Sequence, residues 1–369
     1  MSSTPIGEPI SGGQAPRGWD ELSIRFDDGM DLGKIRALLQ QAKERGGIAG
    51  ETVSAFNLVA IYFSPEAYER AQAALEAAGR FHPCRLLVLV GEQRSGADSV
   101  TARVSVVRSG GAVSLERIVL TASGAGVRHL RSALEGLLLP DLPAVVVWGG
   151  RTEGDLLGRA VDAADRVIVD SGTRAPEALA DVAAMLQRGA PIGDLAWARI
   201  FPWMSLAADV LDVPNLREHR KNLRSARVIC AGGIGAEGVL LAGWFASRVR
   251  KAKVQIDIGP EPETDSSMPG SGDGTSATGW PSAAPLGKGQ IARFELTAPP
   301  VTMVLRREKA VLIAEVRGDD DGEVLHRVRL PPETPGRLLG LELKLLSGQD
   351  ELYAAAVQAA LKLLPKSGS

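Results

Sequence analysis

Short, strongly apolar segments alternate with helical segments through the first half of this chain, and this alternation limits the fold more than any other feature. Four segments have the length and side chains of buried strands: 53–63, 85–90, 144–148 and 166–170. Helical periodicity lies between them, as in residues 65–78, where Ser64 stands at the N-cap position. Strands that alternate with helices of about 10–15 residues form a largely parallel sheet covered by helices on both faces. We therefore predict one α/β domain over residues 20–215.

The second half of the chain follows a different pattern. It begins with a strand, a helix and a strand over 227–231, 236–249 and 253–258, and two helices close it at 334–346 and 350–363. Between these parts, four short strands with intervening turns are predicted at 290–297, 301–306, 310–317 and 323–330. Short strands joined by tight turns are typical of antiparallel pairing. We predict a C-terminal α+β domain over 216–369, with antiparallel strands and a closing pair of helices.

Two segments have compositions that cannot bury a core. Residues 1–19 are rich in Ser, Gly and Pro, which predicts a disordered tail. In the segment 259–288, 19 of 30 residues are Gly, Pro, Ser or Thr, which predicts a flexible loop.

Charge and cysteine usage exclude several classes of function. The chain has 42 basic and 44 acidic residues, and no strongly basic arm of the kind that binds nucleic acid. Its two cysteines, Cys84 and Cys230, lie far apart, so we expect no disulfide framework and two buried, inert thiols. The sequence shows no signal peptide and no apolar run near the ~20 residues that span a bilayer. We expect a cytoplasmic protein with neither a membrane nor a nucleic acid as partner.

The common catalytic and metal-binding motifs are absent from the sequence. Its four histidines, at positions 82, 129, 219 and 326, fall in separate segments and lack the spacing of metal ligands. Neither a GxSxG nucleophile turn nor a GxxxxGK[ST] phosphate loop occurs. We therefore predict no catalytic residues, no metal, no cofactor and no enzymatic activity.

One glycine-rich turn supports an alternative. Gly233, Gly235 and Gly238 follow a predicted strand and open a predicted helix, as the glycines of dinucleotide-binding turns do. Asp257 ends the next strand, 19 residues after Gly238, where an acid that binds ribose is expected. This pattern predicts an NAD(P)-binding enzyme or a sugar-phosphate sensor. The other reading is a tight strand-to-helix turn with a solvated aspartate.

Aromatic side chains gather between residues 194 and 203. Asp194 can cap a helix that carries Trp197, Arg199 and Trp203, and Pro202 predicts a kink or a break in that helix. Tryptophan and arginine dominate the binding energy of protein interfaces, so this corner is a candidate anchor for a partner. The alternative is that both tryptophans are core residues at the domain junction.

Several of these segments together resemble one known family. In order along the chain they are FNLVA at 56–60, HPCR at 82–85, LLPDLP at 138–143, ADRVIVDS at 164–171, DLAWAR at 194–199, LLAGWFASR at 240–248 and LLGLEL at 338–343. This set resembles the OpcA family, the glucose-6-phosphate dehydrogenase assembly proteins of cyanobacteria and actinobacteria. The resemblance covers roughly residues 30 to 364. The glycine-rich turn at 232–238 is a departure from the family pattern.

The resemblance implies a non-catalytic regulator of the oxidative pentose phosphate pathway. Such a protein binds glucose-6-phosphate dehydrogenase and promotes its active oligomeric assembly. On the matching motifs, the candidate partner-binding residues are Trp197, Arg199, Trp203, His82, Arg85 and Asp141. Thiol control, attributed to some members, needs a pair of cysteines, and the two here belong to different predicted domains. The nucleotide-binding and sensor alternatives remain open from the sequence alone.

Overall fold

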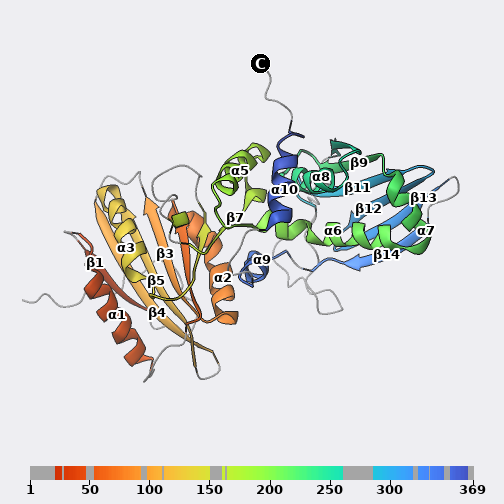
Figure 1. Ribbon diagram of the computed structural model, residues 1–369. Coiled ribbons are helices and arrows are strands. Elements are labelled where there is room, and N and C mark those ends of the chain that lie inside the picture. The colour runs from red at the N-terminus through yellow and green to blue at the C-terminus, as the bar shows by residue number, and fades with distance from the viewer. Residues whose placement is uncertain are drawn as a thin grey trace, which may run out of the picture.

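The computed structural model contains one sheet of eight strands and one of six, with helices against each and between them (Figure 1). The residues that it describes are 21–26, 29–46, 54–92, 98–109, 112–149, 160–162, 164–260, 286–318, 323–331, 333–344 and 350–364. The predicted tail at 1–19 and most of the predicted loop at 259–288 lie outside these residues. The predicted α/β class is confirmed.

The first sheet has the strand order β1-β4-β5-β3-β2-β6-β7-β8. Its strands are β1 (Leu22–Phe26), β2 (Phe56–Tyr62), β3 (Cys84–Glu92), β4 (Ser99–Ser109), β5 (Ala112–Ser123), β6 (Ala144–Trp148), β7 (Arg166–Val169) and β8 (Ile192–Asp194). The strands from β5 to β8 in this order are mutually parallel, whereas β4 and β1 are added antiparallel at one edge. The prediction of a largely parallel sheet is confirmed. Strand β8 has only three residues, and the five residues of β1 alternate between apolar and polar, so neither strand stands out in the sequence.

Helices cover both faces of this sheet, which explains why its central strands are apolar throughout. The helices are α1 (Leu32–Arg45), α2 (Pro65–Phe81), α3 (His129–Leu137) and α5 (Leu179–Gln187). In β2, Val59 faces the core formed with α1 and α3, whereas its neighbour Leu58 faces the core formed with α2. All seven residues of β2 are buried. Strand residues point alternately to the two faces, so a doubly covered strand needs a continuous apolar run.

The second sheet has the strand order β10-β9-β11-β12-β13-β14. Its strands are β9 (Ser225–Ala231), β10 (Lys253–Gly259), β11 (Ile291–Ala298), β12 (Val301–Glu308), β13 (Val311–Arg317) and β14 (Glu323–Arg329). Strands β9 and β10 are parallel and joined through α8 (Ala236–Arg248), and every other pair is antiparallel. This agrees with the predicted α+β half of the chain.

Three helices connect the two sheets. Helix α6 (Leu195–Asp212) leads from β8 to the second sheet, α9 (Pro335–Glu342) packs on α2, and α10 (Glu351–Ala360) packs on α8 and α5 (Figure 1). The short α7 (Pro214–Arg217) follows α6. We propose a domain division near residue 215, after α6, giving units over 20–215 and 216–369. The closing helices of the second unit nevertheless pack on helices of the first.

Of the kink or break predicted at Pro202, the break does not occur, since α6 continues as a helix through that residue. Proline removes one backbone hydrogen bond and crowds the preceding turn. The buried side chains on both sides of it, among them Ile200, Trp203 and Leu206, hold the helix against the two sheets and offset that cost. The predicted N-cap is confirmed, since the Asp194 carboxylate accepts a hydrogen bond from the Ala196 N–H at 2.9 Å.

Candidate functional site

Charged side chains meet between the two sheets, where three elements converge. Asp170 follows β7, Arg199 lies on the second turn of α6, and Glu237 lies in the first turn of α8. The Arg199 guanidinium donates two hydrogen bonds of 2.7 Å to the two carboxylate oxygens of Asp170. Its Nη1 also lies 3.6 Å from Glu237 Oε1. We call these three residues the junction cluster. It joins the first sheet to the second.

The junction cluster is largely shielded from water. The exposed fractions of the Arg199, Asp170 and Glu237 side chains are 12%, 24% and 15%. Burial works against the charged guanidinium, but the hydrogen bonds and charge of Asp170 outweigh it, so the pKa of Arg199 is raised. Gly172 leaves the necessary space, because a Cβ atom there would lie 2.8 Å from Arg199 Nη1.

Of the two carboxylates, Glu237 makes the weaker contact with Arg199. Asp170 takes the bidentate contact, and Glu237 has only the longer contact to Arg199. Burial, first of all, raises the pKa of Glu237 to about 7, and the charges of Glu333 and Asp170 act in the same direction. The nearby Arg199 and Arg307 lower this pKa. Glu237 therefore changes its charge near neutral pH.

We expect Glu237→Gln to stabilise the protein above neutral pH. Because the folded-state pKa lies above the ordinary value, the folded protein holds this proton more tightly than the unfolded chain does. The contribution of Glu237 to stability therefore falls as the pH rises from about 4.5 to about 7, and is level above that. The variant lacks this fall, so at pH 8 its free energy of unfolding should exceed that of the wild type by up to about 3 kcal/mol.

Urea denaturation at pH 5 and pH 8 measures this difference. The exposed Glu177 supplies the control variant Glu177→Gln, which should match the wild type within about 0.5 kcal/mol at both pH values. Equal stability of Glu237→Gln and the wild type at pH 8 would contradict the prediction.

A second buried group, Asp194, holds the start of α6 against the C-terminal helix α10. Its carboxylate accepts hydrogen bonds from the Ser171 hydroxyl at 2.6 Å, the Ser171 N–H at 3.0 Å and the Tyr353 hydroxyl at 2.7 Å, besides the capping bond from Ala196. Asp194 is fully buried, and burial raises its pKa, although these four hydrogen bonds lower it. The sequence identifies Asp194 as an N-cap but gives no sign of its bond to Tyr353.

The two tryptophans of the predicted docking corner are core residues at this junction. Trp197 donates its indole N–H to Asp350 at 3.0 Å, and its ring packs against that of Tyr353. The exposed fractions of Trp197 and Trp203 are 9% and 4%. Their burial supports the core alternative over the anchor alternative. Phe201, between them in sequence, is 63% exposed.

The other three candidate partner residues lie at the amino ends of strands in the first sheet, whereas the junction cluster lies at a carboxyl end. His82 and Arg85 flank the amino end of β3, and Asp141 lies in the turn before β6, with φ at +65°. Arg85 donates to Glu116 Oε2 at 2.8 Å and to the Leu137 carbonyl at 3.2 Å. The six predicted residues therefore do not form one site.

Two of the family motifs, at 56–60 and 138–143, contact each other at the amino ends of these strands. The Asn57 side chain donates to the carbonyls of Leu139 and Leu142 and accepts a hydrogen bond from the Leu139 N–H at 2.8 Å. It thereby fixes the loop between α3 and β6. Two of the motifs that carry the family resemblance thus meet in a structural contact.

The glycine-rich turn has a packing role. A Cβ atom at Gly235 would lie 2.3 Å from the Gly289 carbonyl oxygen, and one at Gly238 would lie 2.3 Å from Cys230 Sγ. Cys230 therefore points toward α8, and its strand neighbour Ile229 toward the other face. Asp257 pairs in register with Ile229 and forms an ion pair with Arg227. Asp257 is therefore paired with Arg227 and, like Ile229, lies on the face of the sheet away from α8.

Both thiols are buried, as predicted, and neither is in a disulfide. Burial raises the pKa of Cys84 to about 12 and that of Cys230 to about 11. Reactivity belongs to the thiolate, so both groups are inert at neutral pH. Within the described ranges, no group of three or more His, Cys, Asp or Glu side chains could hold a metal ion.

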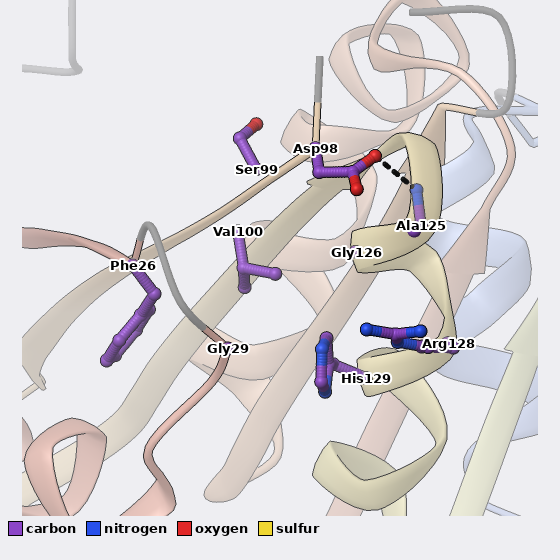
Figure 2. A pocket seen from close by; sticks show the side chains of 9 residues that line it. All are labelled: Phe26, Gly29, Asp98, Ser99, Val100, Ala125, Gly126, Arg128 and His129. Carbon is purple, nitrogen blue, oxygen red and sulfur yellow. Dashed lines mark hydrogen bonds between the residues drawn. The ribbon is translucent and has the colours of Figure 1, made fainter. Parts of the chain in front are cut away.

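A hollow of 340 Å³ lies where β5 ends (Figure 2). Asp98, Ala125 and His129 are among the residues that line it. Carboxyl ends of parallel strands are common ligand sites. Here, however, the Asp98 carboxylate accepts the Ala125 N–H at 2.8 Å, so a side chain of the protein already takes that donor.

Together, the fold and these contacts define a class of protein: an α/β chain of two sheets whose buried polar groups hold its halves together. Two family profiles match it, described as the N-terminal domain and the C-terminal domain of a glucose-6-phosphate dehydrogenase subunit, over residues 75–187 and 190–357. The chain belongs to the OpcA family of glucose-6-phosphate dehydrogenase assembly proteins.

Curated relatives carry the same family name. The OpcA protein of Synechocystis sp., described as an OxPP cycle protein, is 25% identical over 241 residues, which are 63% of this chain and 50% of the relative. The OpcA protein of Nostoc punctiforme is 27% identical over 177 residues, or 46% of this chain and 38% of the relative. The matched region thus spans half or less of the length of these relatives.

Solved structures with a distantly similar fold are oxidoreductases. The 3-ketoreductase KijD10 of Actinomadura kijaniata, with NADP and TDP-benzene, has a TM-score of 0.43 and 13% identity, covering 83% of this chain and 95% of that one. A glucose-6-phosphate 1-dehydrogenase from Mycobacterium avium has a TM-score of 0.41 and 13% identity, covering 84% and 91%. At these values the likeness says nothing of function.

Proposed function

We propose that this chain binds glucose-6-phosphate dehydrogenase and promotes its active oligomeric assembly, without catalysing a reaction itself. The observation that carries the proposal is that two profiles named for a subunit of this dehydrogenase together match most of the chain. An association with the oxidative pentose phosphate pathway follows from the family.

The chemistry of the buried polar groups supports a non-catalytic role. An active site leaves its acid, base or nucleophile available to a substrate. Asp194 is instead surrounded by four hydrogen-bond donors of the protein, and Glu342 forms an ion pair with Arg166 at 2.6 Å. Each of these groups is used to hold two segments of the chain together.

Mass action is the mechanism that we propose for activation. A protein that binds an assembled, active oligomer more tightly than its separate subunits shifts the equilibrium toward the oligomer.

We place the complex in the cytoplasm. Among the described residues, no helix combines the length and the apolar character of a membrane span.

Co-elution with the dehydrogenase of the same organism tests the proposal. The two purified proteins should elute together in size-exclusion chromatography, at a larger mass than the enzyme alone. Dehydrogenase activity should rise with chain concentration and saturate, and heat-denatured chain should have no effect. The chain alone should not turn over glucose 6-phosphate with NADP. Separate elution together with unchanged activity would refute the proposal.

A further inference from the structure

A groove of 760 Å³ runs between α2 and α9, away from the junction cluster. Its floor is made of small side chains. Gly336 lets the two helices approach closely, because a Cβ atom there would lie 3.2 Å from the Ala77 Cβ and 3.4 Å from the Ala74 Cα. Gly340, one turn later on α9, has no atom within 4 Å of a Cβ position, so the groove is open above it.

Basic side chains stand on both rims of this groove. Arg70 and His82 come from the α2 side, and Arg337 and Lys344 come from the α9 side. No acidic residue is among those that line the groove. The formal net charge of the whole chain is −2, so this groove is more basic than the chain as a whole.

Three of these basic groups have no acidic partner among the residues that the structure describes. Arg337, Lys344 and His82 form no ion pair and no side-chain hydrogen bond with any described residue. Arg70 has Glu66 one turn earlier on its own helix. Hydrogen bonds from the Glu66 backbone and from Ser64 lower the pKa of that exposed carboxyl first of all, and the charge of Arg70 adds to this effect. Arg70, Arg337 and Lys344 are exposed, so their charges can meet a partner.

We propose that the α2–α9 groove docks an acidic segment of glucose-6-phosphate dehydrogenase, one that carries carboxylates beside small or apolar side chains. The proposal rests on the proposed function. Two rims that both carry positive charge attract a negatively charged partner and set its orientation. A floor of alanine and glycine allows a helix or strand to approach closely, where desolvated arginine contacts contribute much of the binding energy.

Docking in this groove would also affect how the two halves of the chain are held together. One wall, α2, covers the first sheet, whereas the other wall, α9, follows the last strand of the second sheet. A segment that contacts both walls holds α9 on α2. It thereby favours the state in which Glu342 of α9 pairs with Arg166 of β7.

The test compares two double variants of the full chain. Arg337→Glu with Lys344→Glu reverses the charge of one rim. Arg188→Glu with Lys251→Glu makes the same change of formal charge at two exposed positions outside the groove. Melting temperatures of both should match that of the wild type, because none of these side chains has an ion pair or a side-chain hydrogen bond with a described residue. Calorimetry at low and moderate salt then gives the affinity of each for the dehydrogenase.

We expect the rim variant to bind the dehydrogenase at least about 30-fold more weakly and the control variant to stay within about threefold. Added salt should weaken wild-type binding more than binding by the rim variant. A third variant, Gly340→Leu, fills the groove without changing its charge and should also weaken binding, by about tenfold or more.

The outcomes separate the groove from the proposed function. If the wild-type chain does not bind the dehydrogenase, the proposed function fails and the docking proposal fails with it. If the wild type binds and both groove variants bind equally well, the groove alone is refuted. Titration with inorganic phosphate and with glucose 6-phosphate covers the remaining case. A small anion that binds the wild type but not the rim variant, with dehydrogenase binding unchanged, would make the groove a ligand site and overturn docking.

Discussion

Asp194→Ala is expected to lower the free energy of unfolding by about 3–5 kcal/mol. The substitution removes a carboxylate that accepts hydrogen bonds from Ser171, Ala196 and Tyr353 and is 0% exposed. The donors stay buried, and each buried donor without an acceptor costs about 1–3 kcal/mol. The start of α6 also loses its cap.

Urea denaturation followed by circular dichroism measures this loss. Asp194→Asn keeps one carbonyl acceptor, so we expect a smaller loss, and Tyr353→Phe should cost about 1–2 kcal/mol. Asp209→Ala, an exposed position on the same helix, is the control and should cost less than about 0.5 kcal/mol. A loss below about 1 kcal/mol for Asp194→Ala would mean that these hydrogen bonds are replaced by water or rearrangement.

Glu342→Ala is expected to cost a similar amount, about 3–5 kcal/mol, and to loosen α9 from the first sheet. Arg166 Nη2 and Glu342 Oε2 lie 2.6 Å apart, and the two side chains are 3% and 7% exposed. Gly193 on β8 leaves room for them, because a Cβ atom there would lie 2.3 Å from Glu342 Oε2. Removing Glu342 takes this contact away from the Arg166 charge in a place that water hardly reaches.

Hydrogen exchange locates the effect, since the amides of α9 should exchange faster in Glu342→Ala while those of β2 and β3 change little. The double variant Arg166→Met with Glu342→Leu removes both charges and should recover much of the lost stability. If Glu342→Ala alone is as stable as the wild type, the ion pair contributes nothing. Equal losses in the single and double variants would show that packing, and not charge, is the cause.

Local patterns in the sequence predict most of the secondary structure correctly. Strands such as β2 and β3 are buried on both faces, so their apolar runs are continuous and easily recognised. By contrast, β8 has only three residues and β1 alternates, so neither is apparent without its neighbours. Helix α6 continues through Pro202 because its flanking turns are packed on both sheets, which no local rule reports.

The polar contacts at the junction could not be predicted in the same way. Asp194 and Tyr353 are 159 residues apart, and no spacing rule joins groups so distant in sequence. A tryptophan beside an arginine has the same pattern whether it packs in a core or on a partner. The position of α10 makes Trp197 a core residue, because this helix supplies Tyr353 and its N-cap residue is Asp350. Likewise, the glycines at 235 and 238 could serve a phosphate or a close packing contact, and the position of Gly289 distinguishes these cases.

The packing of α9 also has a consequence for how this protein is made. Leu338, Leu339 and Leu343 belong to the same core as Leu58 and Tyr68, on the α2 face of the first sheet. A ribosome releases the chain from its N-terminus, and domains begin to fold as they emerge. The first sheet therefore has to wait, with part of its apolar surface uncovered, until synthesis has passed residue 343. During that interval we expect this surface to be the part of the nascent chain that most needs a chaperone.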